Sequence, residues 1–326
     1  MIIIDGNALI HRSFHALPPT MTTKDGEIVN AVYGFASVLI KALREFKPDY
    51  AVLTLDKEGP TFRHEEYKEY KAQRERAPED LYKQIPRVKE LARAFGLPIY
   101  EKQGYEADDL IGTIVDKTDD KTEKIIVTGD LDSLQLVDDT TKVYTMSRGL
   151  SESVTYDQSG VREKFDLSPS QMIDYKALRG DPSDNIPGVK GVGEKTATEL
   201  IKQFGDLDSI YKEIDSNPDT DKIKPKTKKL LQEHREDAYL SRDLATIRRE
   251  VDIDFDPEEA SFKDFDQDKV VEFFSELEFK SLLPRLNELD LSQASEKKDK
   301  FERNKNDFNY ILVDTEDKFE EFLGEL

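Results

Sequence analysis

The feature that most constrains the fold is a repeated order of short apolar strand, acidic residue and helix-like segment. Three strands of this kind are each followed by an aspartate: 2–4 by Asp5, 50–55 by Asp56, and 125–127 by Asp130. Strands that alternate with helices are typical of a parallel sheet with helices on both faces. The sequence therefore predicts an α/β fold with a central, mostly parallel sheet. In such sheets ligands bind at the carboxyl ends of the strands, where these aspartates should meet.

Apolar periodicity places the other elements. Further strands are expected at 97–100 and 142–144, and a charged helical stretch, broken by prolines, at 60–95. Helices are expected at 8–17, 30–46, 171–178, 195–204, 226–234, 238–246 and 270–289. Residues 292–306 are polar and lack an apolar period, which predicts a linker, and the last twenty residues resemble the beginning of another domain.

Composition excludes several classes of protein. The 326 residues contain no cysteine, so disulfides and thiolate metal sites are excluded. No run of eighteen apolar residues is present, and the N-terminus lacks the pattern of a signal peptide, which favours a cytoplasmic protein. The formal net charge is −21. That charge does not exclude an anionic partner, because local fields decide phosphate binding and the acidity is greatest after residue 250.

Nine acidic residues are candidates for one metal centre. The motif EADD opens a helical pattern, GDLD follows a strand, and GDPSDN precedes a glycine-rich segment. Acids that lie close together repel one another unless a cation lies between them, and oxygen-only ligands favour Mg²⁺ or Mn²⁺. Each aspartate alone is better explained as a helix cap or strand end, but the full set favours a metal site. The candidate ligands are Asp5, Asp56, Glu106, Asp108, Asp109, Asp130, Asp132, Asp181 and Asp184.

Two further segments suggest phosphate binding. Residues 186–205 combine a glycine-rich hairpin with a helix N-terminus, a pattern that can hold a nucleic-acid backbone, although a plain glycine turn is the alternative. Its candidate DNA-binding residues are Gly188, Lys190, Gly191, Gly193, Lys195 and Thr196. In the segment 62–76, Lys71 and Arg74 should share a helix face, unless this is only a solvated charged helix. The basic segment 222–229 is open to the same two interpretations.

Other chemistries lack support. The four histidines show no metal-ligand spacing, and His11 with His15 is weak evidence without the glutamate of a zinc motif. Neither a G-x-S-x-G elbow nor a Walker loop is present.

Taken together, the segments IIIDGNALIHRSFHAL, FRHEEYKEYKAQR, GYEADDLIGTI, VTGDLDSLQLV and ALRGDPSDNIPGVKGVGEKTA resemble the 5′-nuclease (5′–3′ exonuclease) domain of bacterial DNA polymerase I, in the flap endonuclease superfamily. The resemblance covers residues 1 to about 290. The segment 307–326 is similar to the start of a 3′–5′ exonuclease-like domain, after a linker at 291–306.

The resemblance implies a PIN-like, resolvase-like nuclease core at 1–167 with a helical arch at about 60–95, and an all-α helix-hairpin-helix subdomain at 168–290. It implies two Mg²⁺ or Mn²⁺ ions and a K⁺ ion held by main-chain carbonyls of the hairpin. One metal site would use the acids up to Asp109 and the other those from Asp130. The residues that would hold the scissile phosphate and the arch are Arg12, Arg63, Tyr70, Lys71 and Arg74.

The implied function is a structure-selective 5′–3′ exonuclease and 5′-flap endonuclease that uses a two-metal mechanism in replication and repair. Its partners would be branched or nicked duplex DNA with a 5′ flap and RNA primer–DNA junctions, and the chain would be a monomer. One departure is Leu131, where many relatives have lysine. A non-catalytic DNA-junction binding module with a structural ion, and a related RNA-cleaving nuclease, are the alternatives.

Overall fold

The computed structural model describes residues 1–150, 152–262 and 265–290. Its centre is a six-stranded sheet with the order β3-β2-β1-β4-β5-β6. The strands are β1 (Ile2–Asp5), β2 (Ala51–Thr54), β3 (Ile99–Tyr100), β4 (Lys124–Thr128), β5 (Thr141–Arg148) and β6 (Glu152–Tyr156). The first five run parallel, and β6 pairs antiparallel with β5. The predicted mostly parallel sheet is therefore confirmed.

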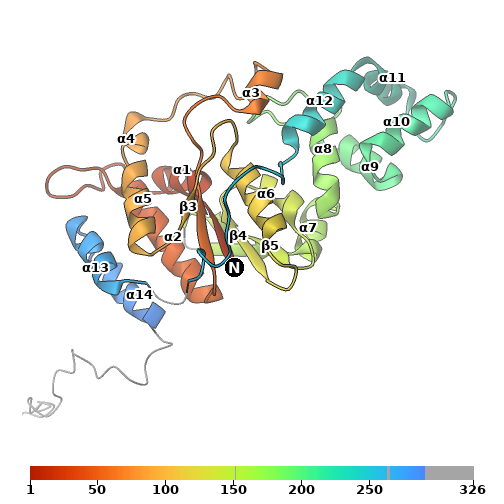
Figure 1. Ribbon diagram of the computed structural model, residues 1–326. Helices are drawn as coiled ribbons and strands as arrows, with labels where there is room; N and C mark the ends of the chain where they lie inside the picture. Colours follow the sequence, from red (N-terminus) through yellow and green to blue (C-terminus); the bar gives the residue numbers. More distant parts are fainter. Residues whose placement is uncertain (151, 263–264, 291–326) are drawn as a thin grey trace, which may run out of the picture. The chain divides into compact units, whose positions relative to one another are not determined.

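The central strands are continuous apolar runs because helices cover both faces of the sheet. Every residue of β1, β2 and β4 is buried. Figure 1 shows α1 (Gly6–Ala16), α2 (Asn30–Phe46) and α5 (Ile85–Ala94) on one side, and α6 (Ala107–Lys117) and α7 (Gln158–Phe165) on the other. On the second side, apolar residues of α6 pack in one cluster with alternate residues of the central strands.

The register of the strands brings the candidate acids to one edge. Ile4 lies opposite both Leu53 and Val127, so β1, β2 and β4 end at nearly the same level. Asp5 is the last residue of β1, and Asp56 and Asp130 follow the other two strands within two residues. The three aspartates thus lie at the carboxyl edge of the sheet, as the sequence predicts.

A helical region follows the sheet. It contains α8 (Met172–Arg179), α9 (Glu194–Phe204), α10 (Leu207–Ser216), α11 (Pro225–Glu233) and α12 (Arg235–Ala245). The hairpin before α9 packs tightly against the end of α8. Gly188 has a φ of 62°, and a Cβ atom on it would lie 2.2 Å from the amide nitrogen of Gly180. Only glycine fits that position.

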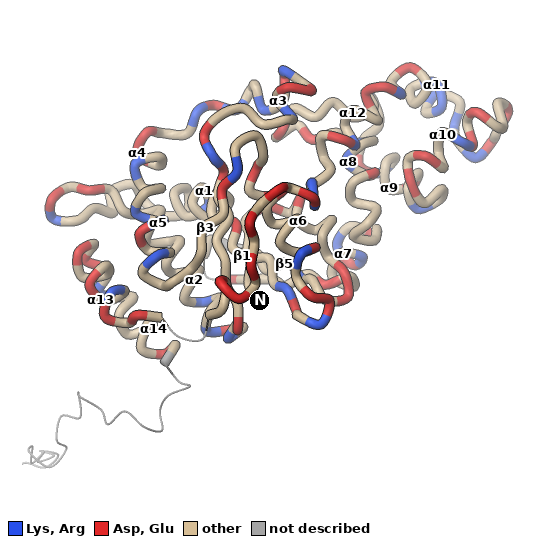
Figure 2. The backbone as a smooth tube through the Cα atoms, in the orientation of Figure 1, with Lys and Arg blue, Asp and Glu red and all other residues tan. Residues whose placement is uncertain are grey.

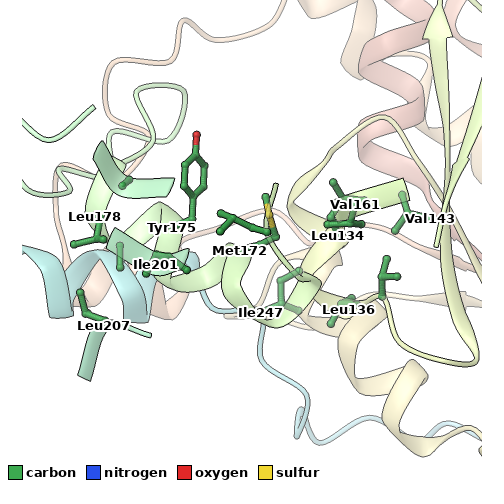
Figure 3. Packing of buried hydrophobic residues seen from close by; sticks show 14 of the residues in the cluster. Leu134, Leu136, Val143, Val161, Met172, Tyr175, Leu178, Ile201, Leu207 and Ile247 are labelled. Atoms are coloured by element: carbon green, nitrogen blue, oxygen red, sulfur yellow. The ribbon is translucent and has the colours of Figure 1, made fainter. Parts of the chain in front are cut away.

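One apolar core joins the sheet and the helical region. Leu134 and Leu136, in the 3₁₀ helix η1 (Asp132–Leu136), belong to the same cluster as Val161 of α7 and Met172 of α8. Figure 3 shows this cluster continuing to Leu178, Ile201 and Leu207. The helical region is therefore packed onto the sheet through side chains of both.

Three features differ from the sequence expectation. The segment 62–76 is helical only in α3 (Phe62–Glu66), and Lys71 has a left-handed φ of 54°. The predicted shared helix face of Lys71 and Arg74 is therefore wrong: the Lys71 amide donates to the Asp184 carbonyl at 2.9 Å, a contact that no local helix allows. The segment continues through α4 (Glu79–Tyr82) into α5.

At the other end, the expected helix at 270–289 is divided into α13 (Gln267–Glu276) and α14 (Leu283–Asn287) by a left-handed Glu278. β6, α7 and α10 were not expected. The predicted linker and the predicted start of a further domain lie outside the described residues. Of the helices in the described ranges, none is both long and apolar enough to cross a membrane.

Candidate active site

A cavity of about 440 Å³ lies at the carboxyl edge of the sheet. It is lined by most of the predicted metal ligands together with the predicted phosphate-binding residues. The acids are Asp5, Asp56, Glu106, Asp108, Asp130, Asp132 and Asp184, and the others are Arg12, Arg63, Tyr70, Lys71 and Arg74. Residues from five separate parts of the sequence thus share one site.

Asp5 is fixed by its place between β1 and α1. Its carboxylate caps α1 by accepting from the Ala8 amide at 3.0 Å, and it accepts from the Thr128 hydroxyl at 2.6 Å. Burial, together with the charges of Asp130 and Asp56, raises the pKa of Asp5 to about 7 despite these two hydrogen bonds. The fold therefore holds a carboxylate where ionisation is unfavourable unless positive charge is supplied.

Ionisation of Asp108 is opposed by its surroundings even more strongly than that of Asp5. It lies in the first turn of α6 and points to the acids at the sheet edge. Burial raises its pKa well above the ordinary value, and so do the charges of Asp5, Asp130, Asp132 and Glu106. All of these neighbouring charges are negative, which is the environment of a cation site.

Asp56 joins the end of β2 to α6. It accepts from the Ala107 amide at 2.7 Å and from the Asn7 side chain at 2.9 Å, and the Asn7 carbonyl in turn accepts from the Asp56 amide. Asn7 is a site residue that the sequence reasoning did not identify. Arg12 lies across the cavity on α1, where its Nε donates to the Gly149 carbonyl at 3.2 Å.

The acids that come from the helical region have cationic partners from the chain itself. Lys176 on α8 lies between Asp132 and Asp181, and its Nζ is 2.7 Å from the Asp181 carboxylate. Although burial opposes it, Lys176 and hydrogen bonds from Ser183 lower the pKa of Asp181 to about 2. Burial and Asp130 raise the pKa of Asp132 to about 7 despite Lys176. Asp181 is not among the residues that line the cavity.

Lys176 was not predicted from the sequence. The available signal was its position in the last turn of a helix, five residues before the first aspartate of GDPSDN. A lysine there can reach back to the loop that follows, but the same pattern is typical of a solvated helix end.

Tyr70, Lys71 and Arg74 contact the acids directly. The Tyr70 hydroxyl lies 3.1 Å from both Glu106 and Asp184, so it joins the two acids. Lys71 Nζ is 2.9 Å from Glu106 and 3.7 Å from Asp184, and Arg74 pairs with Asp184. The structure brings these predicted residues together at the cavity, although they do not share a helix.

Arg63 and Asp109 form a buried ion pair with each other and do not extend into the open part of the cavity. Their side chains are 3% and 0% exposed, and the guanidinium holds both carboxylate oxygens, at 2.7 and 2.8 Å. Asp109, like Asp181, does not line the cavity.

The residues present suit divalent cations by their chemistry. Among the described residues, no three Asp, Glu, His or Cys side chains are drawn together closely enough to hold a metal ion. Instead, Lys71 and Lys176 each lie between two carboxylates, and Arg74 pairs with Asp184. The donors are carboxylate oxygens at several element ends, and Asp5 and Asp108 are surrounded by negative charge. Such a donor set favours Mg²⁺ or Mn²⁺ over softer metals.

The glycine hairpin presents its cations outward. Lys190 and Lys195 are exposed, and α9 begins after Gly193 without a side-chain cap, so its first amides are available to an anion. Gly191 has a φ of 90° and lies against Leu230 of α11. Thr196 lies in the first turn of α9. Figure 2 shows further Lys and Arg residues on α11, interspersed with acids.

Known proteins resemble the chain in sequence. The chain is 41% identical over 289 residues to DNA polymerase I of Caldicellulosiruptor bescii and 44% identical over 284 residues to that of Chloroflexus aurantiacus. These alignments cover 88% and 86% of the chain but only 33% and 29% of the two relatives. The chain thus spans about a third of the length of the curated relatives that it matches.

Solved structures share the fold. A structure of T5 5′-exonuclease with bound zinc aligns with a TM-score of 0.61 at 22% identity, covering 86% of this chain and 98% of that one. The catalytic core of Rad2 in complex with a DNA substrate aligns with a TM-score of 0.56 at 22% identity, covering 87% and 92%. At this identity the likeness concerns the fold.

Two family models match consecutive parts of the chain. Residues 167–268 match the 5′-3′ exonuclease C-terminal SAM fold, and residues 1–166, which contain the sheet and most of the acids, match the 5′-3′ exonuclease N-terminal resolvase-like domain. Because the two models together cover most of the chain, the chain belongs to the 5′-3′ exonuclease family.

Proposed function

We propose that the chain is a divalent-metal-dependent 5′–3′ exonuclease and 5′-flap endonuclease that hydrolyses phosphodiester bonds of DNA and of RNA primers. The observation that carries the proposal is the cavity in which carboxylates from β1, β2, β4 and α6 face Tyr70, Lys71 and Arg74. The carboxylates of this cavity are suited to bind metal ions, and its Lys and Arg side chains are suited to bind a phosphate.

The acids that would hold two Mg²⁺ or Mn²⁺ ions are Asp5, Asp56, Glu106 and Asp108 on one side, and Asp130, Asp132, Asp181 and Asp184 on the other. Bound there, the ions would activate water and neutralise the leaving oxygen. Lys71 and Arg74 now pair with Glu106 and Asp184. With those carboxylates holding metal ions, the two side chains would be available to orient the scissile phosphate and to stabilise its charge in the transition state. Arg12, at the opposite wall, would contact the same strand.

The substrate would be held by the helical region. We propose residues 1–167 as the nuclease core, with the segment at about 60–95 as its arch, and 168–290 as a helix-hairpin-helix subdomain that binds duplex DNA. The hairpin amides, Lys190 and Lys195 would contact backbone phosphates without reading bases. A K⁺ ion at the hairpin carbonyls would add to this grip. The proposal extends to the chain's being the N-terminal part of a DNA polymerase I, cytoplasmic and monomeric.

The direct test is cleavage of a labelled duplex with a 5′ flap in excess Mg²⁺, read on a denaturing gel. We expect products cut near the junction, and none in EDTA. The variant Asp130→Asn/Asp184→Asn should lose cleavage while it still binds the flap substrate in a gel-shift assay, because it keeps the hairpin and the fold.

The alternative, a non-catalytic DNA-junction module with a structural ion, makes a different forecast. It requires tight flap binding by the unaltered chain without any product at several pH values and salt concentrations, and that outcome would overturn the proposed activity. Cleavage of single-stranded RNA in preference to the flap would point to the related RNA-cleaving class.

A further inference from the structure

Arg63 uses every one of its hydrogen-bond donors inside the protein. A guanidinium has five N–H groups. Nε donates to the Leu244 carbonyl at 2.8 Å, and one Nη2 hydrogen goes to the Thr246 carbonyl at 2.9 Å. The remaining three go to carboxylates: two to Asp109, at 2.7 and 2.8 Å, and one to Glu106 at 3.4 Å. No donor remains for a phosphate.

Asp109 likewise uses all of its hydrogen-bond acceptors inside the protein. Its Oδ1 accepts from Arg63 and from the Arg248 amide at 2.9 Å, and its Oδ2 accepts from Arg63 and from the Glu106 amide at 3.1 Å. Each oxygen thus has two donors, which is its capacity in the plane of the carboxylate. The side chain is fully buried. A metal ion could reach it only by breaking these bonds.

The pair joins three parts of the chain that are distant in sequence. Arg63 belongs to α3, at the start of the segment that carries Tyr70 and Lys71, and Asp109 belongs to the first turn of α6. The third part is the end of α12 and the segment that follows it, through the carbonyls of Leu244 and Thr246 and the amide of Arg248.

A ring next to Arg63 reinforces the junction. Two guanidinium groups lie over the ring of Phe62: the Cζ atom of Arg63 is 4.5 Å from the ring centroid, and the Cζ atom of Arg248 is 4.7 Å from it. These cation–π contacts add to the hold on α3. A buried, fully bonded ion pair with such neighbours fixes geometry rather than serving a ligand.

We propose that Arg63 and Asp109 are positioning residues, neither a phosphate ligand nor a metal ligand: together they lock the base of the arch and the end of the helical region to the first turn of α6. Through the lock, Glu106 and Asp108 keep their place relative to Tyr70 and Lys71. This inference rests on the proposed nuclease function for its effect on cleavage, but the lock itself can be tested without cleavage.

The first test uses paired variants and thermal unfolding in EDTA. Arg63→Met and Asp109→Asn should each lower Tm by several degrees, because each leaves a buried partner unpaired. The double variant Arg63→Met/Asp109→Asn should regain about half of the larger loss, since the uncompensated charge is gone. The matched control is the exposed bidentate pair of Arg235 and Asp215: Arg235→Met and Asp215→Asn should change Tm little, separately and together.

The second test separates a lock from a metal ligand by counting bound Mn²⁺ calorimetrically in the absence of DNA. Asp109→Asn should bind as many ions as the unaltered chain, with an affinity lowered by about tenfold, whereas Asp108→Asn should bind fewer ions. In flap cleavage, Asp109→Asn should lower kcat by about tenfold or more and leave KM within about threefold, because the DNA grip is intact. The double variant should keep the same ion count.

Two results would overturn the lock. One is additive Tm losses in the double variant, which would show that the two residues do not act as a unit. The other is loss of a bound Mn²⁺ ion in Asp109→Asn equal to that in Asp108→Asn. If the unaltered chain fails to cleave DNA, the proposed function fails, yet the Tm cycle and the ion count still decide on the lock.

Discussion

The acids at the sheet edge and the acids from the helical region lie under opposite electrostatic conditions. Asp5 and Asp108 lie among other carboxylates, and their pKa values are raised by burial and by those neighbours. Asp181 and Asp184 have Lys176 and Arg74 as partners, and the pKa of Asp181 falls to about 2. The charges that act on Asp5 and Asp108 are thus those of other acids, whereas Asp181 and Asp184 are already paired with cations.

This difference indicates an order of metal affinity. A cation that enters at the sheet edge relieves repulsion that the fold has left uncompensated, whereas a cation on the other side must compete with an ammonium or guanidinium group. We therefore expect the sheet-edge position to bind first and more tightly.

The largest effect is expected for Asp108→Asn. Removal of the most crowded carboxylate should raise the free energy of unfolding of the metal-free protein by about 1–3 kcal/mol, because repulsion falls. The same change should reduce flap cleavage by about 10²–10³-fold, since the site loses a charged ligand. Chemical denaturation in EDTA and single-turnover cleavage in Mg²⁺ measure the two. A metal-free protein that is less stable than the unaltered chain would contradict the contrast.

An effect on stability of opposite sign, with a smaller effect on function, is expected for Lys176→Met. Asp132 and Asp181 lose their shared partner, so the metal-free protein should lose about 2–3 kcal/mol of stability, somewhat less than for a fully buried pair. Binding of the second Mn²⁺ ion should become severalfold tighter, because its competitor is gone. Calorimetric titration measures the affinity for the second Mn²⁺ ion. The matched control is Lys202→Met, which removes an exposed ion pair with Asp166. Weaker binding of the second ion would contradict the competition.

The smallest effect is in the pH dependence of metal-free stability. The folded pKa values of Asp5 and Asp132 are about 7, against an ordinary 3.8, so the folded state takes up protons first as the pH falls. Stability from these groups is full below about pH 4 and is lost as the pH rises through 7. Asp181 acts oppositely: its contribution is present above 3.8 and is lost as the pH falls through 2.

The metal-free Tm should accordingly be several degrees higher at about pH 5 than at about pH 8, and saturating Mg²⁺ should remove that difference. Differential scanning calorimetry in EDTA and in Mg²⁺ makes the comparison. Asp5→Asn should reduce the slope. A metal-free Tm that rises steadily between pH 5 and pH 8 would show that ionisation of the sheet-edge acids does not destabilise the fold.

Much of the fold and the site could be predicted because their causes are local. The sequence shows directly that β1, β2 and β4 are apolar runs and that an aspartate follows each of them. Parallel pairing then brings Asp5, Asp56 and Asp130 to one edge of the sheet. The hairpin before α9 was legible from its glycines. The short β6 was missed because its residues are exposed or half-buried and lack a clear alternation.

The rest depends on contacts between distant residues. The helix expected around Lys71 gives way to a backbone bond with Asp184, more than a hundred positions later. Lys176 is indistinguishable in the sequence from a solvated lysine. Arg63 and Asp109 stand within motifs that also supply Lys71 and Asp108 to the cavity, and only the complete set of their hydrogen bonds distinguishes them from those residues.

The shared apolar core has a consequence for how such chains can vary and be engineered. Leu134, Leu136 and Val161, from the first family-matched part, pack in one cluster with Met172, Ile201 and Leu207 from the second (Figure 3). The boundary near residue 167 is therefore no seam at which one part can be exchanged for that of a relative. A chimera joined there would inherit two half-cores of different shape, and it would need matched substitutions on both sides to fold as tightly as either parent.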